Sequence, residues 1–255
     1  GWVEDLTRAV GKPILMGNVA REGEARDPDR KWYNAVFVAD PVTGVDIDHY
    51  YAKRHLVPFG EYVPLSGILP FIKKVVPVEG EFFPGQSARP LELKFKDTTE
   101  KVGILICYED IFSTLARSNV RQGADWHYVA TNNVWYGREA GAWQHAAHSV
   151  LRAVETRRPV VRCGNAGWSG WIDEFGHIRH VMLDEENSIY FQGVEAVPFS
   201  RSRFWEGKLS TYVKHGDWFI ALCLLLMGLG WLCIRYAPAR EEHVVARRSV
   251  MGGLR

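Results

Sequence analysis

Apolar and polar positions in the first 215 residues form short apolar runs separated by stretches with helical spacing. A helix that runs into a strand is predicted over residues 1–19, and residues 110–124 and 139–158 have the spacing of further helices. Apolar runs typical of strands occupy residues 33–40, 45–51, 101–107, 125–131, 159–167, 170–181 and 188–197. Strands that alternate with helices predict an α/β fold with stacked layers of sheet and helix.

The C-terminal region has a different pattern. From Trp218 to Ile234 there are 17 residues without a charge, and as a helix this run would be roughly 25 Å long, near the lower limit for crossing a bilayer. Aromatic residues that favour a membrane interface, Trp231 and Tyr236, lie near its end. A buried core helix is the alternative, but the run is apolar on every face. We therefore expect a transmembrane helix over residues 216–236.

This helix divides the chain into a predicted globular domain over residues 1–215 and a polar tail over residues 237–255. Within the globular domain, residues 65–85 carry three prolines among large apolar side chains, and prolines would break a long helix there. An apolar irregular loop is unusual, because loops normally lie on the wet surface. The segment fits either a loop packed under its own side chains or a lid that dips into a membrane.

Composition narrows the possible partners. The net charge of +1 leaves no basic surplus to neutralise phosphates, which argues against nucleic acid. Ten tryptophans favour surfaces that are half apolar and half wet, membrane interfaces among them. The four cysteines form no CxxC pair, which argues against a zinc ribbon or a thioredoxin-like motif.

Cys107 lies where the apolar run 101–107 gives way to the polar sequence Tyr-Glu-Asp. A free cysteine is most often an inert core thiol. The end of a buried strand, however, is where α/β proteins build their sites. A nucleophilic thiol needs a base and a nearby cation, because a free thiol titrates at about pH 8.5.

Lys53 and Glu61 provide a cation and an acid within one short segment. Both residue types are normally solvated, so a surface pair is the simplest interpretation. Glu61, however, is embedded in the apolar sequence Leu-Val-Pro-Phe-Gly-Glu-Tyr-Val. A carboxylate in such a stretch is either paired or functional.

Several spaced motifs resemble a known family. The sequence resembles the nitrilase, or carbon–nitrogen hydrolase, superfamily in the strings YAKRHLVPFGE, ILICYE and TNNVWYG. More narrowly, it resembles the apolipoprotein N-acyltransferases of Gram-negative bacteria in LVPFGEYVP, CYEDIF, WQHAAHSVLRAVETRRPVVRCGNAG and the C-terminal span. The resemblance covers residues 5–236 and implies a nitrilase-like α-β-β-α sandwich followed by one C-terminal transmembrane helix.

The resemblance also implies roles for individual residues. Cys107 matches the nucleophile of the family's Glu–Lys–Cys triad, and Lys53 matches the lysine that helps to stabilise the oxyanion, beside a backbone N–H after the cysteine. Glu61 matches a further acid of the catalytic site. Supporting or substrate-binding positions are implied for Glu109, Tyr108, Asn132 and Trp135.

One part of the family pattern is absent from the sequence. The base glutamate of the family lies in a Pro-Glu motif after an apolar strand, and no such motif precedes residues 11–19. Glu4 precedes a helix rather than ending a strand, so it is not assigned. The family also has several N-terminal transmembrane helices. We therefore expect this chain to be a fragment that holds two of the three triad residues.

Other polar clusters suggest structure rather than chemistry. His145 and His148 are three residues apart on a helix, but no HExxH motif or further ligand cluster accompanies them. We expect polar contacts there, with no metal and no cofactor. A salt-bridged helix face is predicted for the charged set Arg152, Glu155, Arg157 and Arg158.

The resemblance implies a membrane-bound acyltransferase that acts on lipoproteins. It would move a fatty acyl chain from a phospholipid, through a thioester on Cys107, to the amine of an N-terminal diacylglyceryl-cysteine. Its partners would be the phospholipid donor, the apolipoprotein acceptor and the bilayer. It would lie in the bacterial inner membrane with the catalytic domain on the periplasmic side. The alternatives are an amidase of the same fold that acts on small amides, and a catalytically silent, membrane-anchored module.

Overall fold

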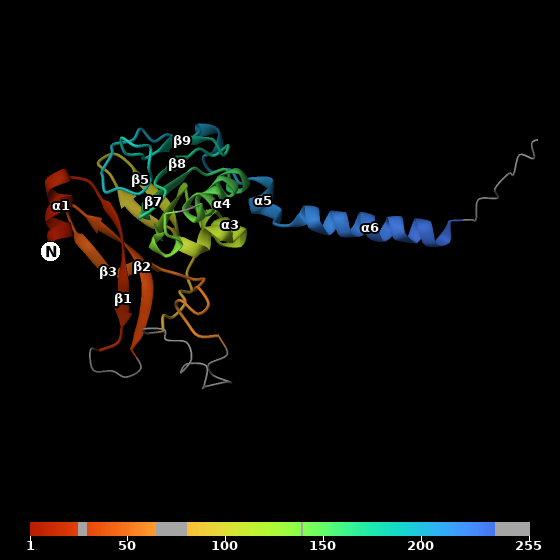
Figure 1. The fold of residues 1–255 in the computed structure, drawn as a ribbon, viewed down its shortest axis with the longest axis horizontal. Coiled ribbons are helices and arrows are strands. Elements are labelled where there is room, and N and C mark those ends of the chain that lie inside the picture. Colours follow the sequence, from red (N-terminus) through yellow and green to blue (C-terminus); the bar gives the residue numbers. More distant parts are fainter. Residues whose placement is uncertain (25–29, 65–80, 139, 238–255) are drawn as a thin grey trace, which may run out of the picture. The chain divides into compact units, whose positions relative to one another are not determined.

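A computed structural model describes residues 1–24, 30–64, 81–138 and 140–237 of the chain (Figure 1). The chain divides into two compact units that meet between Gly216 and Asp217. The first unit holds the sheets and their covering helices, and the second holds one long helix.

The first sheet is an antiparallel arrangement of three neighbouring strands. Its order is β1 (Ile14–Glu22), β2 (Lys31–Asp40) and β3 (Gly44–Ala52). Helix α1 (Trp2–Val10) packs against β2 and β3 on the outer side. It ends at Gly11, whose left-handed φ of 65° suits a residue without a Cβ.

The second sheet is mixed and, among the described residues, has six strands in the order of the chain. They are β4 (Leu91–Lys94), β5 (Thr99–Ile106), β6 (Trp126–Asn132), β7 (Val160–Asn165), β8 (Gly170–Ile172) and β9 (Ile178–Val181). The three central strands β5, β6 and β7 run parallel, and the outer pairs are antiparallel. The carboxyl ends of β5, β6 and β7 therefore meet at one edge.

Helices and short helical turns connect the parallel strands. The connections are η1 (Cys107–Ile111) and α3 (Ser113–Arg121) after β5, and η2 (Val134–Tyr136) and α4 (Gly141–Thr156) after β6. After β9 come η3 (Arg203–Trp205) and α5 (Thr211–His215). Figure 1 shows α3 and α4 beside the second sheet.

Two apolar cores define the layers of the first unit. The inner core lies between the sheets and includes Val36 and Tyr51 from the first sheet and Ile104 and Ile106 from the second. The outer core, around Leu105 and residues of the helices, lies between the second sheet and α3 and α4. With α1 on the far side of the first sheet, the layers follow the order α-β-β-α. This confirms the expected α/β sandwich.

Two of the predicted strands differ from the structure. The run over residues 170–181 forms two antiparallel strands, β8 and β9, because a turn at residues 173–177 interrupts it. Residues 188–197 form no strand, although their apolar spacing suggests one. Ile189 is buried in the outer core, but residues 192–196 are all exposed. Because no strand of the described chain pairs with this segment, its backbone runs as an extended coil over the surface. Most of the apolar segment over residues 65–85 lies outside the described residues.

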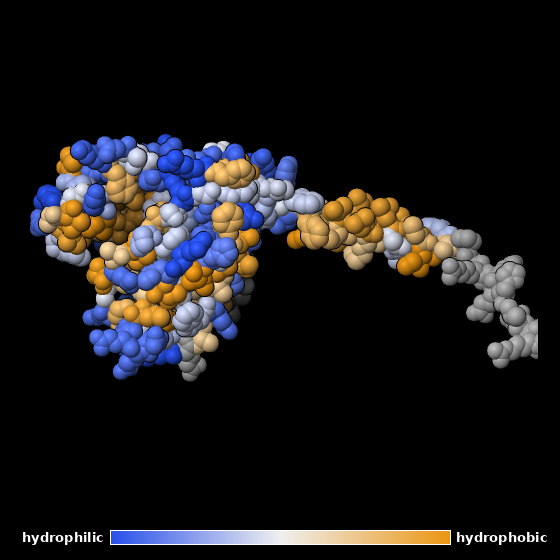
Figure 2. Space-filling view, turned by 90° about the horizontal axis from the view of Figure 1, so that it is seen from above, coloured by the Kyte–Doolittle hydropathy of each residue, from blue (hydrophilic) through white to orange (hydrophobic). Residues whose placement is uncertain are grey.

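The second unit contains α6 (Trp218–Tyr236), as expected for the apolar run. The helix has 19 residues and a mean hydropathy of 2.0, so it is long and apolar enough to cross a membrane. No residue of α6 is buried. Figure 2 shows apolar surface along this helix. A helix that is apolar all round needs an apolar environment.

His127 on β6 makes the fold sensitive to acid. The side chain is fully buried and its Nε2 lies 3.2 Å from Thr156 Oγ1. Burial, and then the nearby Arg158 and Arg152, lower the pKa of His127 from 6.5 to about 3. The unfolded chain therefore binds a proton below about pH 6.5 that the folded chain excludes until about pH 3. Stability is full above this window and falls as the pH drops through it.

We expect the chain to lose about 2 kcal/mol of unfolding free energy between pH 6.5 and pH 5 through this residue. Unfolding of the intact protein in detergent, followed at both pH values, measures the loss. The variant His127→Gln cannot titrate and should lose less over the same interval. Equal pH dependence of the two proteins would contradict the assignment.

Candidate active site

Cys107 lies at the tip of β5 with a left-handed backbone, φ +49°. A strand that continued straight would place residue 107 on the same face as Leu105, under α4. The left-handed turn instead places the half-buried Cys107 against the inner core, with Ile104 and Ile106. The local backbone thus determines that the thiol lies on the side that faces the first sheet.

Lys53 directly follows β3 of the first sheet, on the other side of the inner core. Val36 and Tyr51 belong to the inner core, so strand alternation places Asn34 and Lys53 on that face too. Only 1% of Lys53 is exposed. Its carbonyl accepts a hydrogen bond of 2.8 Å from the N–H of Gly85. A Cβ on this glycine would lie 2.3 Å from the Ala52 carbonyl oxygen, so the close approach requires glycine.

Glu61 pairs with Lys53 across the end of the first sheet. Lys53 Nζ donates to Glu61 Oε2 at 2.7 Å, and the N–H of Val57 donates to the same oxygen at 2.8 Å. Asn34 Nδ2 donates to Glu61 Oε1 at 2.9 Å. A buried ammonium is tolerated only when a carboxylate with satisfied oxygens balances it. Lys53, Glu61 and Asn34 therefore form one fixed polar unit, and Asn34 is a member that the sequence did not indicate.

Glu109 joins this unit to the turn that carries Cys107. Its fully buried carboxylate accepts hydrogen bonds from four donors: Tyr51 Oη (2.8 Å), Arg54 N (2.7 Å), His55 N (3.1 Å) and Ile106 N (2.8 Å). Burial raises the pKa of Glu109, although these donors act in the opposite direction. Two of the donors directly follow Lys53, and one directly precedes Cys107. The structure therefore brings Lys53, Glu61, Cys107 and Glu109 together.

Arg54 fixes the same loop to α3, and sequence reasoning missed it. Its guanidinium donates to Tyr51 Oη (3.0 Å), Ser118 Oγ (2.7 Å), Asn119 Oδ1 (2.7 Å) and the carbonyl of Leu115 (3.3 Å). With every nitrogen bound inward, the charge holds the loop rather than a ligand. The only signal in the sequence was a second cation, next to Lys53 and two residues after the end of β3.

Asp110 points to the opposite side of the turn, into the helix layer. Its carboxylate is buried and contacts Arg162 of β7, Ser149 Oγ (2.8 Å) and His145 Nε2 (2.9 Å). Burial alone would raise the pKa of Asp110, but the charge of Arg162 and the hydrogen bond from His145 hold it below its usual value. His145 Nε2 also lies 3.1 Å from the Cys107 carbonyl oxygen. His145 thus makes the polar contacts expected of it.

Arg152 extends this contact along α4. Its Nη1 donates to the carbonyls of Asp110 (3.2 Å) and Ile111 (2.7 Å), and its Nη2 donates to Glu155 at 2.8 Å. The expected salt bridge on the helix is therefore present between Arg152 and Glu155. The guanidinium is nevertheless buried, because it also binds the end of η1.

The remaining predicted positions surround the turn less closely. The ring of Tyr108 packs edge-on against Phe112, with centroids 5.0 Å apart. Asn132 Oδ1 accepts from the N–H of Val134 at 3.2 Å, so Asn132 shapes the turn after β6. Trp135 in that turn is 85% exposed.

Tyr136 is a neighbour of the site that the sequence did not indicate. Its ring packs edge-on against His145, with centroids 5.8 Å apart. Burial, and then the charges of Cys107 and Asp110, raise the pKa of Tyr136. The hydroxyl therefore lies within electrostatic reach of the thiol. The signal was its place four residues beyond the end of β6.

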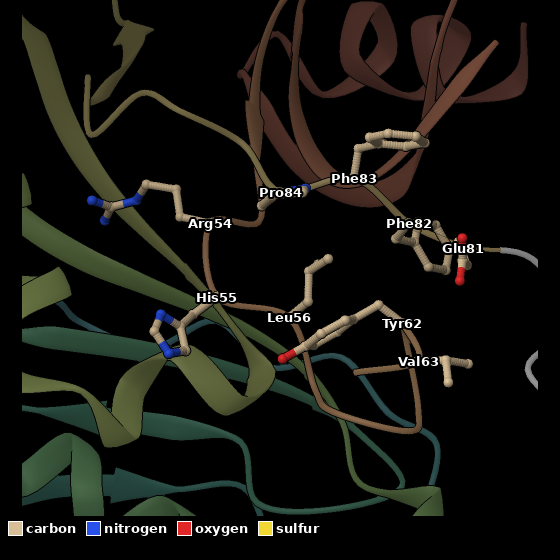
Figure 3. Close-up of a pocket in the computed structure, with 9 residues that line it drawn as sticks. All are labelled: Arg54, His55, Leu56, Tyr62, Val63, Glu81, Phe82, Phe83 and Pro84. Atoms are coloured by element: carbon tan, nitrogen blue, oxygen red, sulfur yellow. The ribbon is translucent and has the colours of Figure 1, made fainter. Parts of the chain in front are cut away.

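A cavity of about 410 Å³ opens between the loop after β3 and residues 81–84. Figure 3 shows Leu56, Tyr62 and Phe82 around it, and the side chain of Arg54 extending away. Its lining is mainly apolar and aromatic, with His55 at the side near the site. Within the described ranges, no group of His, Cys, Asp and Glu side chains could hold a metal ion.

Replacing Glu109 by Gln tests the joining role of the carboxylate. The amide NH₂ would face backbone N–H donors, so at least one buried donor would lose its acceptor. We expect the variant to lose about 2–4 kcal/mol of unfolding free energy, measured by unfolding of the intact protein in detergent. Glu92→Gln, on the exposed side of β4, makes the same chemical change and should have little effect. Equal stability of the two variants would contradict the role.

The chain is similar to known proteins of one family. Residues 2–195 match the carbon-nitrogen hydrolase family. A protein of Geobacter metallireducens named apolipoprotein N-acyltransferase is 38% identical over 97% of this chain and 42% of its own length. One of the same name from Bdellovibrio bacteriovorus is 30% identical over 86% of this chain and 39% of its own. This chain thus spans about two fifths of the length of these relatives.

Among solved structures, an amidase from Nesterenkonia sp. is 18% identical, with a TM-score of 0.49 over 71% of this chain and 60% of that one. The family match covers most of the chain, and the observed layers are those of a nitrilase-like fold. The chain therefore belongs to the carbon-nitrogen hydrolase family.

Proposed function

We propose that this chain carries the catalytic domain of an apolipoprotein N-acyltransferase with Cys107 as its nucleophile. The observations that carry the proposal are the buried Lys53–Glu61 pair and a thiol that follows a left-handed turn and packs against the core between the two sheets. The similarity to relatives of that name over nearly the whole chain supports the choice of reaction.

The proposed reaction has two halves. The thiolate of Cys107 attacks the carbonyl carbon of a phospholipid acyl ester, the ester C–O bond breaks, and a lysophospholipid leaves with a proton. The amine of an N-terminal diacylglyceryl-cysteine then attacks the thioester. The C–S bond breaks, an amide forms, and the proton lost by the amine restores the thiol. A thioester thus divides one difficult transfer into two easier ones.

Lys53 is proposed to stabilise the negative oxygen that develops in both halves. The ammonium is almost fully excluded from water, and Glu61 and the backbone hold it in one place. A fixed charge in such surroundings needs no reorganisation during the reaction. Glu61 is assigned to orient Lys53, because both of its oxygens already accept hydrogen bonds.

The base that removes the thiol proton is not assigned to the acids described above. Glu61 is paired with Lys53, and Glu109 accepts four hydrogen bonds. We propose that a glutamate outside residues 1–255 takes this role, as the family pattern implies.

The membrane part of the proposal rests on α6. We propose that α6 crosses the bacterial inner membrane and keeps the first unit on the periplasmic side. Both proposed substrates carry acyl chains and lie in that bilayer. The apolar cavity lined by Leu56, Tyr62 and Phe82 is of a chemistry that suits an acyl chain.

The second candidate is an amidase that acts on small amides, which the nitrilase-like fold alone would allow. Water would then replace the lipoprotein amine. Release of ammonia from small amides by the pure protein, without any dependence on lipid, would favour it. The apolar helix and the names of the relatives favour the acyltransferase.

The nucleophile can be tested by mass spectrometry of the intact protein, expressed from its complete reading frame and incubated with phospholipid. We expect an acyl adduct that Cys107→Ala abolishes and Cys163→Ala retains, because Cys107 packs against the core between the sheets, whereas Cys163 is exposed. An adduct that survives Cys107→Ala would refute the assignment.

Lys53→Met should reduce the rate of adduct formation by roughly 10²–10³-fold, as expected when a group that stabilises an oxyanion is removed. Methionine keeps most of the volume and removes the charge. Lys96→Met makes the same change on the exposed surface and should leave the rate unchanged. Similar rates for the two variants would exclude Lys53 from the chemistry.

A further inference from the structure

Side chains on one face of α4 hold the turn η1 through hydrogen bonds. His145, Ser149 and Arg152 follow the i, i+4, i+7 spacing of a single helix face, and all three bind polar groups of η1 or its side chains. Arg162 of β7 completes the contact through Asp110. None of these side chains has a part in the chemistry proposed above.

The turn needs such a contact because its backbone is strained. A non-glycine residue with a φ of +49° lies in a sparsely populated region, which persists only when its surroundings hold it there. The relaxed alternative is an extended residue 107. Its side chain would then share the face of Leu105 and point into the apolar layer under α4. The strained, left-handed conformation of residue 107 therefore determines on which face of the second sheet the thiol lies.

His145 is the α4 side chain that touches the strained residue itself. Its Nε2 lies 3.1 Å from the Cys107 carbonyl oxygen and 2.9 Å from Asp110 Oδ1. With two oxygen acceptors nearby, this nitrogen carries the proton and donates. Arg162 and Ser149 bind the other carboxylate oxygen of Asp110, so the acceptor that orients the imidazole is itself fixed.

We propose that His145 is a positioning residue. Asp110 orients its imidazole, which donates a hydrogen bond to the Cys107 carbonyl and thereby keeps the thiol on the face of the second sheet that looks toward the first sheet. The naming of Cys107 as a nucleophile rests on the proposed function, whereas the orientation of its thiol does not. The histidine neither exchanges a proton with substrate nor touches it. It acts only through the backbone of residue 107.

The test measures alkylation of each cysteine by iodoacetamide in the intact protein, resolved by peptide mass spectrometry. Cys163 is exposed and serves as the internal reference. In His145→Leu we expect the rate at Cys107, relative to Cys163, to fall about fivefold or more, because one hydrogen bond is lost and the thiol turns into the apolar layer. His145→Gln keeps a donor and should recover most of the rate.

His148→Leu is the matched control, since it makes the same change on the same helix and should leave the ratio unchanged. Ser149→Ala removes one hydrogen bond to Asp110 but keeps the Asp110–Arg162 ion pair. It should slow Cys107 by a smaller factor, and it covers the case in which His145→Leu does not fold. If His145→Leu left the alkylation rate at Cys107 unchanged or raised it, the proposal would be overturned. A faster rate would mean that the substitution only loosens the turn and exposes the thiol.

The acylation assay separates this proposal from the proposed function. If the wild-type protein forms an acyl adduct, His145→Leu should lower kcat with little change in KM for the phospholipid, and His145→Gln should restore it. An unchanged kcat in His145→Leu would also overturn the positioning role. If the wild type forms no adduct, the proposed function fails, and the alkylation ratio alone still decides whether His145 orients the thiol.

Discussion

The buried carboxylate of Glu109 is the interaction on which the site depends. It is one group that accepts hydrogen bonds from a strand of the first sheet, from the loop after it, and from the end of β5 in the second sheet. An apolar core brings two sheets together but leaves them free to slide, because apolar contacts have no direction. Directed hydrogen bonds to a charged acceptor remove that freedom. The position of the loop after β3 relative to the end of β5 follows from this.

The two adjacent acids of the turn divide the work of holding it. Glu109 reaches toward the first sheet, and Asp110 reaches into the helix layer, where Arg162 and His145 bind it. The turn is thus fixed from both sides, and the strained Cys107 lies just before the two anchors. Buried charges are costly unless they are fully paired. The groups that pair with these two carboxylates lie on neighbouring segments, so the same contacts also fix the positions of those segments.

Much of the fold could be predicted because periodicity reports local structure, and most predicted strands and helices are present. The strand over residues 188–197 was wrong because spacing does not reveal whether a partner strand exists. Within the site, the choice of Lys53, Glu61 and Cys107 came from a family resemblance and not from pattern, and of these the structure pairs Lys53 with Glu61. The left-handed backbone of Cys107 and the contacts of Asp110 arise only from tertiary packing, so the sequence could not indicate them. For His145 the sequence indicated polar contacts but not their partners, the Cys107 carbonyl and Asp110.

The loop between Lys53 and Glu61 donates hydrogen bonds from its backbone. The N–H groups of Arg54 and His55 bind the carboxylate of Glu109, and the N–H of Val57 binds that of Glu61. Such donors belong to the main chain and are the same for every residue except proline. The side chains at positions 55 and 57 can therefore be changed without loss of these bonds. Insertions and deletions are a different matter, because they would shift which amide meets which oxygen. In this loop the length is therefore more constrained than the identity of its side chains.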